Sequence, residues 1–380
     1  MPKPLTILIG IPCLKVGGTE VQTLRLVEAL TELGYHCVTV CYFEYDIAMT
    51  RRFEEAGNRV VCLSAYGRRP ASTREVYRFL KTGLKRVVKE YRPDVAHIQY
   101  MAPGALPIIV LRRLGIKTIL ATLHTDADIY QSLRLIHFLH KHCVRLFTCV
   151  SKKAEQNFFG EAHDVEESHL AGRHGHITLS NCLAPHYPMG QARQYIANQS
   201  FTIGIVARLE AIKGVDFVMP AFAEVLKHYP DSRLIIVGDG SMLAQMERQQ
   251  EELHIPADRI EWAHGVNYRQ LPDYYSRIDI AWMPSRSEGF GLSALEAMAQ
   301  GCPIVVSAVG GLTEIVRDNV DGLWCTPESS TDLATKTLAL MANPELMTSM
   351  SQRARNHAED YSFEQYLESI KTIYTNITSK

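Results

Sequence analysis

The stretch from Met283 to Val316 reads M-P-S-R-S-E-G-F-G-L-S-A-L-E-A-M-A-Q-G-C-P-I-V-V-S-A-V-G-G-L-T-E-I-V and is the most informative part of the sequence. It starts inside a short apolar segment, Ile278–Met283, which the pattern predicts to be a buried strand. A loop with Glu288 and a Gly-Phe-Gly triplet follows, and a helix is predicted to start near Leu292. A second apolar strand, Ile304–Ser307, comes after this helix. The order strand, glycine-rich turn, helix, strand indicates an α/β architecture.

This turn has the chemistry of an anion site with acids beside it. The first amides of a helix lack internal acceptors, and glycines let a backbone approach a phosphate closely. Glu288 precedes the predicted helix and Glu296 lies just over one turn into it. A site for phosphate alone does not need two acids, but carboxylates accept hydrogen bonds from sugar hydroxyls. The combination predicts a nucleotide-sugar site, and the alternative is an ordinary α/β turn with surface acids.

The run resembles the signature of retaining glycosyltransferases of family 4, in which two glutamates with this spacing surround a Gly-Phe-Gly turn. The sequence G-G-L-T-E at 310–314, which usually accompanies that signature, is also present. The resemblance implies the GT-B fold, in which two Rossmann-like, doubly wound α/β domains face each other across a cleft. It also implies transfer of a sugar from a nucleotide-diphospho-sugar with retention of the anomeric configuration.

The length of 380 residues predicts two domains. Proline, glycine, asparagine and glutamine interrupt the pattern between Asn181 and Ser200, so a linker is expected there. We therefore predict an acceptor-binding domain over residues 1–190 and a nucleotide-sugar-binding domain over residues 191–361. The resemblance implies that the C-terminal helix, residues 362–380, packs back on the first domain.

Apolar segments alternate with helical ones along the first half, which is typical of a parallel sheet covered on both faces. The second half repeats the alternation from Phe201 onward. The predicted strands of the first half are Leu5–Ile11, Cys37–Tyr42, Arg59–Leu63, Val95–Gln99, Thr118–Leu123, Leu146–Val150 and Ile177–Leu179, and its predicted helices are Thr19–Leu33, Ser72–Tyr91, Ala105–Leu114 and Ala127–His142.

Charge is distributed unevenly along the chain. Residues 1–190 carry 24 Lys and Arg against 17 Asp and Glu, whereas residues 191–380 carry 16 against 24. A basic first half favours an anionic partner, either a phosphate-bearing acceptor or an acidic lipid surface, and nucleic acid is not expected. Basic residues in 72–89 and 133–147 keep two interpretations open, peripheral membrane contact and a solvated helix face.

No apolar run is long enough to span a bilayer. The nine cysteines are scattered through apolar segments without metal-ligand spacing, which favours reduced thiols in a cytoplasmic protein. The expected location is therefore the cytoplasm, either free or peripheral on the inner face of the membrane.

Two further positions in the first half follow predicted strands. Gly17 and Gly18 precede a predicted helix and resemble the family's N-terminal loop, which meets the donor diphosphate. His124 follows the strand Thr118–Leu123, at the sheet edge where parallel strands end and ligands bind. The resemblance gives His124 a sugar contact, whereas a helix-capping segment with Thr125 or Asp126 as cap is the alternative.

Arg208 and Lys213 follow the first strand of the second half. Two cations at this place are able to hold a diphosphate and neutralise the charge that builds on it. The pair resembles the arginine and lysine of the family closely. A solvated loop is the alternative interpretation.

No metal is expected. Asp126 and Asp128 form a D-x-D, which binds a divalent metal in another glycosyltransferase fold, but here the motif opens a predicted helix. The histidines His137, His140 and His142 are interpreted as a polar helix face. The two cations and the amide dipoles already face the phosphates.

The resemblance assigns His124 and Glu288 to the reacting sugar as catalytic residues, and Glu296 to the ribose. The backbone at Phe290, Gly291 and Leu292 is assigned to the departing phosphates. The donor is a substrate, so no cofactor is expected, and a UDP- or GDP-sugar is favoured. The acceptor is a glycan, a glycolipid or a polyprenyl-linked sugar of a cell-surface pathway. Two alternatives remain: an epimerase or phosphorylase of the same fold, and a non-catalytic sugar-binding module.

Overall fold

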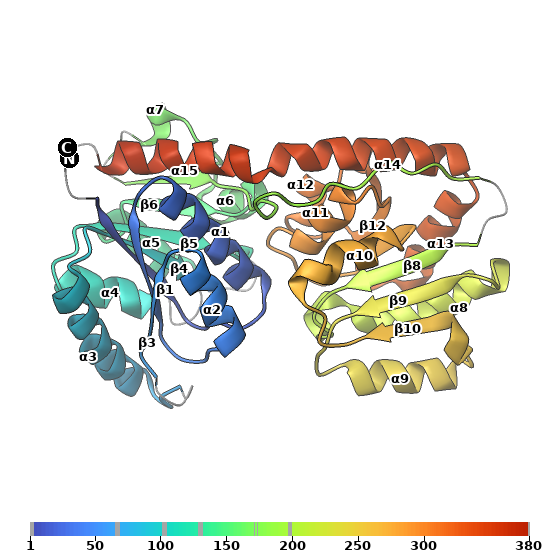
Figure 1. The fold of residues 1–380 in the computed structure, drawn as a ribbon, viewed down its shortest axis with the longest axis horizontal. Helices are drawn as coiled ribbons and strands as arrows, with labels where there is room; N and C mark the ends of the chain where they lie inside the picture. The colour runs from blue at the N-terminus through green and yellow to red at the C-terminus, as the bar shows by residue number, and fades with distance from the viewer. Residues whose placement is uncertain are drawn as a thin grey trace. The chain divides into compact units, whose positions relative to one another are not determined.

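The computed structural model describes residues 4–64, 69–100, 105–127, 132–170, 172, 174–196 and 200–378. The chain forms two compact units, and Figure 1 draws the first from blue to green together with the red C-terminal helix and the second from green to red. Unit 1 comprises Met1–Pro185 together with Phe363–Lys380, and unit 2 comprises His186–Ser362. The chain therefore passes from one unit to the other at Pro185, within the predicted linker.

Unit 1 contains a parallel sheet of seven strands in the order β3-β2-β1-β4-β5-β6-β7. All seven strands predicted for the first half are present, each within two residues of its predicted ends. Their bounds are β1 (Thr6–Ile11), β2 (His36–Cys41), β3 (Arg59–Cys62), β4 (Val95–Tyr100), β5 (Thr118–Leu123), β6 (Leu146–Cys149) and β7 (Gly175–Thr178).

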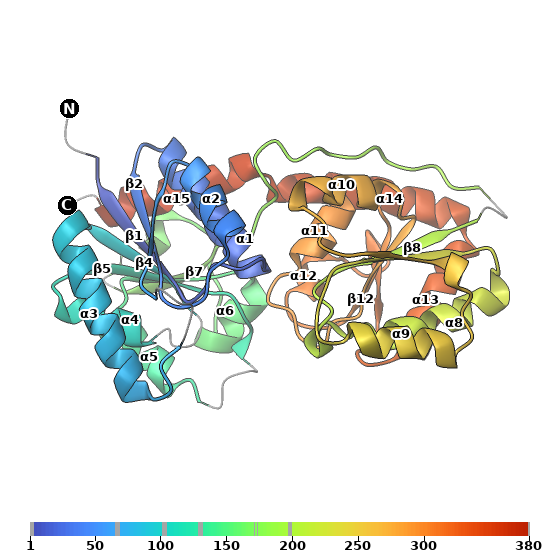
Figure 2. The same ribbon diagram turned by 60° about the horizontal axis from the view of Figure 1, so that its bottom comes forward.

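Helices cover both faces of this sheet. Figure 2 shows α1, α2 and α15 on one face and α3, α4 and α5 on the other. The helices α2, α6 and α7 were not predicted. The helix α5 begins at Arg134 rather than at Ala127, and residues 128–131 lie outside the described part of the chain. The bounds are α1 (Gly18–Glu32), α2 (Ile47–Glu55), α3 (Thr73–Tyr91), α4 (Ala105–Arg113), α5 (Arg134–His142), α6 (Lys152–Phe159), α7 (Glu167–Leu170) and α15 (Phe363–Thr378).

The strands of unit 1 are mostly apolar because both faces of the sheet are buried. In β1, Ile7 and Ile9 join the apolar cluster that contains α1 and α15, whereas Leu8 joins the cluster that contains α3 and α4. Successive side chains of a strand point to opposite faces, so one strand supplies both cores.

Unit 2 contains a parallel sheet of six strands in the order β10-β9-β8-β11-β12-β13. Its strands are β8 (Thr202–Val206), β9 (Arg233–Val237), β10 (Ile260–Ala263), β11 (Ile280–Met283), β12 (Ile304–Ser307) and β13 (Gly322–Cys325). Its α-helices are α8 (Val218–His228), α9 (Leu243–Glu252), α10 (Leu271–Ser276), α11 (Leu292–Ala299), α12 (Leu312–Ile315), α13 (Ser330–Met341) and α14 (Pro344–Ala358).

The strand order gives each sheet a switch point. In unit 2 the chain builds β8, β9 and β10 in one direction and then returns to add β11 on the other side of β8. In unit 1 the corresponding switch point lies between β1 and β4. Loops that leave the carboxyl ends of the strands at such a point diverge and leave room for a ligand. The two switch points are therefore the places where a site is expected.

The predicted linker has no helix or strand at its described positions, 181–196 and 200. Arg193 ties this segment to unit 2, because its guanidinium donates to the carbonyl oxygens of Tyr275 (2.7 Å) and Ile278. Among the described residues, no helix is long and apolar enough to cross a membrane.

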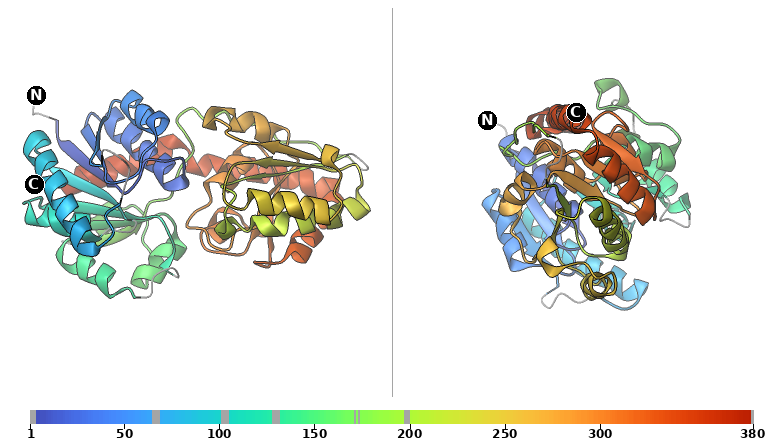
Figure 3. Two further views of the ribbon diagram at one scale, coloured as in Figure 1. Left: turned by 90° about the horizontal axis from the view of Figure 1, so that it is seen from below. Right: turned by 90° about the vertical axis from the view of Figure 1, so that its right-hand side faces the viewer.

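The C-terminal helix α15 belongs to unit 1 and packs beside α1, and the left view of Figure 3 shows this red helix next to the blue one. Its Tyr374 reaches the sheet, where its hydroxyl lies 2.9 Å from His97 Nδ1. The other ring nitrogen of His97 lies 2.7 Å from the hydroxyl of Thr122. Burial lowers the pKa of His97 to about 3, so the imidazole is neutral in the folded protein.

We predict that the stability of unit 1 falls as the pH is lowered. An unfolded chain protonates His97 below its ordinary pKa of 6.5, whereas the folded protein does not until about pH 3. Between pH 7.5 and 5.0 this one side chain lowers the unfolding free energy by about 2 kcal/mol. In His97→Gln the unfolding free energy should fall by about 2 kcal/mol less than in the wild type between pH 7.5 and 5.0.

The measurement is urea unfolding followed by far-UV circular dichroism. All three tryptophans, Trp262, Trp282 and Trp324, lie in unit 2, so tryptophan fluorescence follows that unit separately. An equal pH dependence in the variant and the wild type contradicts the prediction.

Candidate functional site

Two predicted residues meet at the switch point of unit 2. Lys213 lies in the loop after β8 and Glu288 in the loop after β11, and β8 and β11 are neighbouring strands. The ammonium of Lys213 lies 2.5 Å from Glu288 Oε2. Both side chains keep some exposure, 21% for Lys213 and 14% for Glu288, so a ligand is able to reach them.

A glycine lets the two loops touch. Gly214 follows Lys213 with φ +64, in the left-handed region that favours glycine. A Cβ atom at this position would lie 1.9 Å from the carbonyl oxygen of Pro284, which follows β11 directly. The loop after β8 therefore packs on bare backbone, and only glycine allows Lys213 to come this close to Glu288.

Arg286 fixes the Lys213 loop and was missed by the sequence prediction. Its guanidinium makes two bonds to the Asp216 carboxylate (2.8 and 2.7 Å), donates to the Ala211 carbonyl oxygen (2.5 Å) and lies 4.7 Å from the centre of the Phe217 ring. Its backbone amide donates to the Ile212 carbonyl oxygen (2.9 Å). The hydrogen bonds from Arg286 lower the pKa of Asp216.

The glycine-rich turn after β11 is closed from the side by a second pair of glycines. The amide of Gly311 donates to the Glu288 carbonyl oxygen (2.9 Å). A Cβ atom on Gly310 would lie 2.1 Å from the same oxygen, and Gly310 has φ +44. The Gly-Gly pair downstream of the signature therefore holds the backbone of Glu288 in place.

The turn ends at Gly291, the N-cap of α11, which has φ +105. Among the hydrogen bonds of the described residues, none is donated by the amides of Leu292 and Ser293, so both donors are available to an anion. The Phe290 side chain is buried and meets Tyr361 edge to face, with ring centroids 5.6 Å apart. Of Phe290, only the backbone is left to contact a ligand.

Glu296 lies one turn into α11, beside two tyrosine hydroxyls. It is only 8% exposed. The hydroxyl of Tyr275 lies 3.2 Å from Glu296 Oε2 and 3.1 Å from the Ser293 carbonyl oxygen. Burial, and next to it the charge of Glu296, raises the pKa of both Tyr275 and Tyr187. This carboxylate is therefore held in a preformed orientation.

Arg208 stands at the end of β8 and is exposed. Its loop is fixed by the turn after β9, because the Leu209 amide donates to the Asp239 carbonyl oxygen (2.8 Å). Gly238 has φ +143, and a Cβ atom there would lie 1.9 Å from the Ala207 carbonyl oxygen. Arg208, Lys213, Glu288 and the α11 amides thus all follow the adjacent strands β8 and β11.

The predicted residues of unit 1 lie near its own switch point. Gly17 is the N-cap of α1, and Gly18 is the first residue of that helix, which follows β1. A Cβ atom on Gly17 would lie 2.5 Å from Glu20 Oε2. The Glu20 carboxylate also accepts from the Cys13 thiol (2.9 Å). Because Gly17 has no Cβ atom, the Glu20 carboxylate is able to lie against the backbone at position 17.

His124 follows β5, next to β4. Its Nε2 lies 2.6 Å from Gln99 Oε1, so Nε2 carries the proton and Nδ1 keeps a lone pair. Burial lowers the pKa of His124 to about 3. The side chain is therefore neutral and acts by hydrogen bonding rather than as a cation.

The D-x-D motif is only half described, because Asp128 lies outside the described residues. Asp126 Oδ1 accepts from the Ala127 amide (2.6 Å) and from Asn157 Nδ2 (2.7 Å). Asp126 is buried, and these two bonds give it a structural role in its loop.

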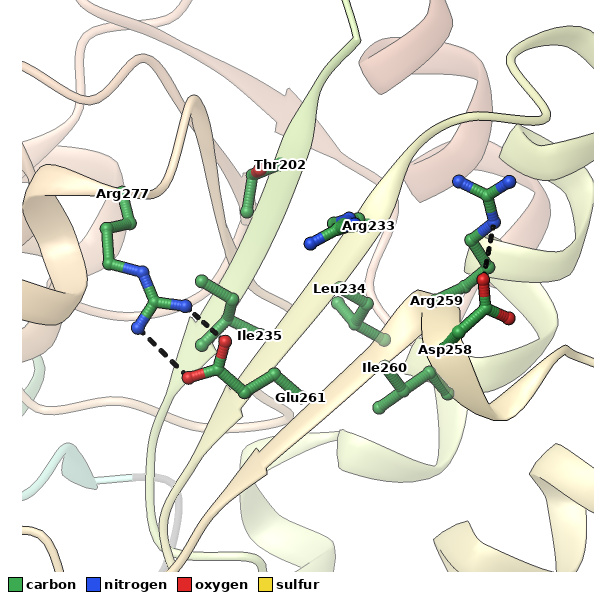
Figure 4. A pocket seen from close by; sticks show the side chains of 9 residues that line it. All are labelled: Thr202, Arg233, Leu234, Ile235, Asp258, Arg259, Ile260, Glu261 and Arg277. Carbon is green, nitrogen blue, oxygen red and sulfur yellow. Dashed lines mark hydrogen bonds and ion pairs between the residues drawn. The ribbon is translucent and has the colours of Figure 1, made fainter.

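The hollow drawn in Figure 4 is not part of the candidate site. It lies at the amino ends of the strands, lined by the first residues of β8, β9 and β10, whereas the candidate site lies at the carboxyl ends. Two of its three arginines are already paired, Arg277 with Glu261 and Arg259 with Asp258, and Arg233 is the third. We do not assign it a ligand.

Comparison with known proteins agrees with this arrangement. Residues 191–357 match the family model described as Glycosyl transferases group 1, and residues 17–153 match the model described as Glycosyl transferase 4-like domain. Two Rossmann-like parallel-sheet domains with these matches define the GT-B class of glycosyltransferases. The chain belongs to the group 1 glycosyl transferases.

Its relatives include an uncharacterized glycosyltransferase of Haemophilus influenzae, 26% identical over 94% of this chain and 96% of the relative. A D-inositol 3-phosphate glycosyltransferase of Geodermatophilus obscurus is 34% identical over 47% of this chain and 41% of the relative. Among solved structures, Anabaena HepE in complex with UDP-glucose superposes with a TM-score of 0.77 at 17% identity, covering 98% of this chain and 99% of HepE.

We predict that Arg286→Ala loosens the loop that carries Lys213. The change removes the bonds to Asp216 and Ala211, so backbone amides in residues 211–217 should exchange with deuterium faster. Loss of charge-assisted bonds of this kind costs about 1.5–3 kcal/mol, or about 10- to 100-fold in local exchange protection. The measurement is hydrogen–deuterium exchange read by mass spectrometry.

Arg277→Ala is the matched control, because Arg277 also pairs with a carboxylate in unit 2 but lies at the amino ends of the strands. Equal exchange in residues 211–217 of both variants would show that Arg286 does not fix this loop.

Proposed function

We propose that this glycosyltransferase moves a hexose from a nucleotide-diphospho-sugar to a hydroxyl of a glycan, a glycolipid or a polyprenyl-linked acceptor, with retention of configuration. The single observation that carries the proposal is the contact of Lys213 with Glu288 beside the free amides of α11. One cation, one acid and two unpaired donors at a switch point suit a sugar attached to a diphosphate. The UDP-glucose bound to HepE makes a UDP-sugar the first donor to test.

In this proposal the diphosphate lies on the amides of Leu292 and Ser293, with Arg208 and Lys213 beside it. Negative charge grows on the departing phosphate as the glycosidic bond breaks, and preorganised cations and amides stabilise it. Arg208 is exposed and therefore has the freedom to turn onto the diphosphate when it binds. No metal is needed for this step.

The two acids take different parts of the donor. Glu296, held by Tyr275, accepts hydrogen bonds from the ribose hydroxyls. Glu288 accepts from hydroxyls of the transferred sugar. His124 and the Gly17-Gly18 loop belong to unit 1, and their contacts with sugar and diphosphate are proposed from the family resemblance. The neutral state of His124 suits a hydrogen bond to a sugar hydroxyl.

The acceptor hydroxyl attacks the anomeric carbon from the side of the leaving phosphate. The bond from this carbon to the phosphate oxygen breaks, the bond to the acceptor oxygen forms, and a phosphate oxygen takes the proton of the hydroxyl. Glu288 is a poor candidate for a covalent nucleophile, because its carboxylate is paired with Lys213 at 2.5 Å.

The acceptor is proposed to meet unit 1, because residues 1–190, which make up most of it, carry 24 Lys and Arg against 17 Asp and Glu. Phosphate-bearing acceptors and an acidic membrane surface both suit that charge. All nine cysteines are free, which favours the cytoplasm, and peripheral contact with the inner face of the membrane belongs to the same proposal.

Glu296→Gln is expected to lower kcat/KM for the donor about 10- to 100-fold, because a neutral amide accepts weaker hydrogen bonds from the ribose. The volume and the bond to Tyr275 are retained, so the fold should be unchanged by circular dichroism. A thermal-shift panel of UDP-, GDP- and ADP-sugars selects the donor for this assay. Glu345→Gln, an exposed acid on α14, is the matched control. Full activity of Glu296→Gln would refute the ribose contact.

Incubation of the donor without acceptor separates the proposed reaction from its alternatives. A transferase gives at most slow hydrolysis of the donor. An epimerase converts the donor sugar in the absence of acceptor, and a binding module leaves the donor unchanged. With acceptor present, Lys213→Ala should lower the transfer rate about 100- to 1000-fold. Nuclear magnetic resonance of the product reports the anomeric configuration, and an inverted product would contradict the retaining mechanism.

A further inference from the structure

Histidines from four segments of unit 1 gather beside its edge strand β7. They are His140 on α5, His163 in the loop after α6, His169 on α7 and His176 on β7. Ring centroids lie 4.4 Å apart for His163 and His169, 5.2 Å for His163 and His176, and 5.5 Å for His140 and His176. The imidazole is the side chain that most often binds transition metals.

Two of these histidines and one acid have the spacing of a ligand set. One ligand atom each from Glu161, His163 and His176 lies within 4.8 Å of the other two. Ligands that hold Zn²⁺ in a tetrahedron at about 2.1 Å lie about 3.4 Å from each other. His163 Nε2 already lies 3.4 Å from Glu161 Oε1, and small side-chain rotations are enough to complete the set.

A buried carboxylate orients one of the histidines. Glu155 on α6 is fully buried, and its Oε1 lies 2.6 Å from His176 Nδ1. With Nδ1 as the donor, His176 Nε2 keeps its lone pair for a metal, which is the usual arrangement behind a metal-binding histidine. The Phe159 ring stacks on His176 with centroids 4.4 Å apart and an angle of 7°, so the imidazole plane is fixed.

Glu155 also ties the same loop to the strand. Its Oε2 accepts from the Thr178 hydroxyl (2.5 Å) and from the His163 amide (3.2 Å). The Thr178 amide in turn donates to the His163 carbonyl oxygen (2.8 Å). The backbone of His163 is therefore held against β7 before any ion binds. Ion binding then costs little conformational entropy in this loop.

Ring stacking alone does not explain this cluster. Ring stacking accounts for the position of His140, which packs on Phe147 and Phe159. The Nε2 atom of His140 is buried and has no hydrogen-bond partner among the described residues. Ring stacking does not account for Glu161, an exposed acid that lies against the part-exposed His163. A cation bound by Glu161, His163 and His176 gives this carboxylate and these two imidazoles a common partner, and His140 is not one of its ligands.

We propose that Glu161, His163 and His176 bind one divalent transition-metal ion, with Zn²⁺ as the ion that suits two imidazoles and a carboxylate best. The fourth position is open to water. The ion would fasten the loop after α6 to the exposed edge of β7, and so stabilise unit 1. This assignment departs from the sequence prediction of no metal, and it does not depend on the proposed transfer reaction.

The test is a titration of the full chain, prepared without a histidine tag and stripped of metal with a chelator. Co²⁺ should give a visible d–d absorption that saturates at one equivalent, and Zn²⁺ should displace it. Zn²⁺ should also raise the temperature of the far-UV unfolding transition. No saturable absorption at one equivalent would overturn the proposal.

Variants assign the ligands. His163→Ala and Glu161→Gln should each weaken Co²⁺ binding at least about tenfold. The matched controls are His142→Ala, an exposed histidine on α5, and Glu166→Gln, an exposed acid of the same loop, and both should bind as the wild type does. Glu161 is exposed, so its variant keeps the fold even if a histidine variant loses it. Wild-type affinity in Glu161→Gln and in a folded His163→Ala would overturn the assignment.

Discussion

The candidate site depends on one close approach between two loops of unit 2. The loop after β8 rests on the Pro284 carbonyl at the end of β11, and Gly214 is the residue that permits this contact. Because the loops touch, an ammonium 75 residues away in sequence lies 2.5 Å from the Glu288 carboxylate. Arg286 holds the same loop through its ion pair with Asp216, so backbone packing and this partly exposed ion pair together fix the position of Lys213 beside Glu288.

Three glycines fix the positions of the loops in this site. Gly214, Gly238 and Gly310 each have a positive φ and each lie where a Cβ atom would collide with a carbonyl oxygen of a neighbouring loop. The loops therefore stack backbone on backbone. The amides of Leu292 and Ser293 at the start of α11 donate no hydrogen bond among the described residues, so they are available to an anion.

Unit 1 uses its polar groups differently. His97 and His124 are kept neutral by burial, with pKa values of about 3, and each is held by hydrogen bonds to neighbouring strands. The histidines beside β7 are more exposed and meet an acid instead. Histidine thus serves as a structural hydrogen-bonding group inside the sheet at His97, as the proposed sugar contact at His124, and as the proposed metal ligand at the sheet edge.

The alternation of apolar segments determined the two parallel sheets, and the motif around Glu288 determined the family, because both are periodic or local in the sequence. The sequence did not indicate α2, the late start of α5 or the role of Arg286, since tertiary contacts decide these. The sequence also did not predict that His163 lies near His176, because this contact depends on strand pairing, which places β7 beside the loop after α6. Side chains far apart in the chain become a site only when backbone packing fixes their distances.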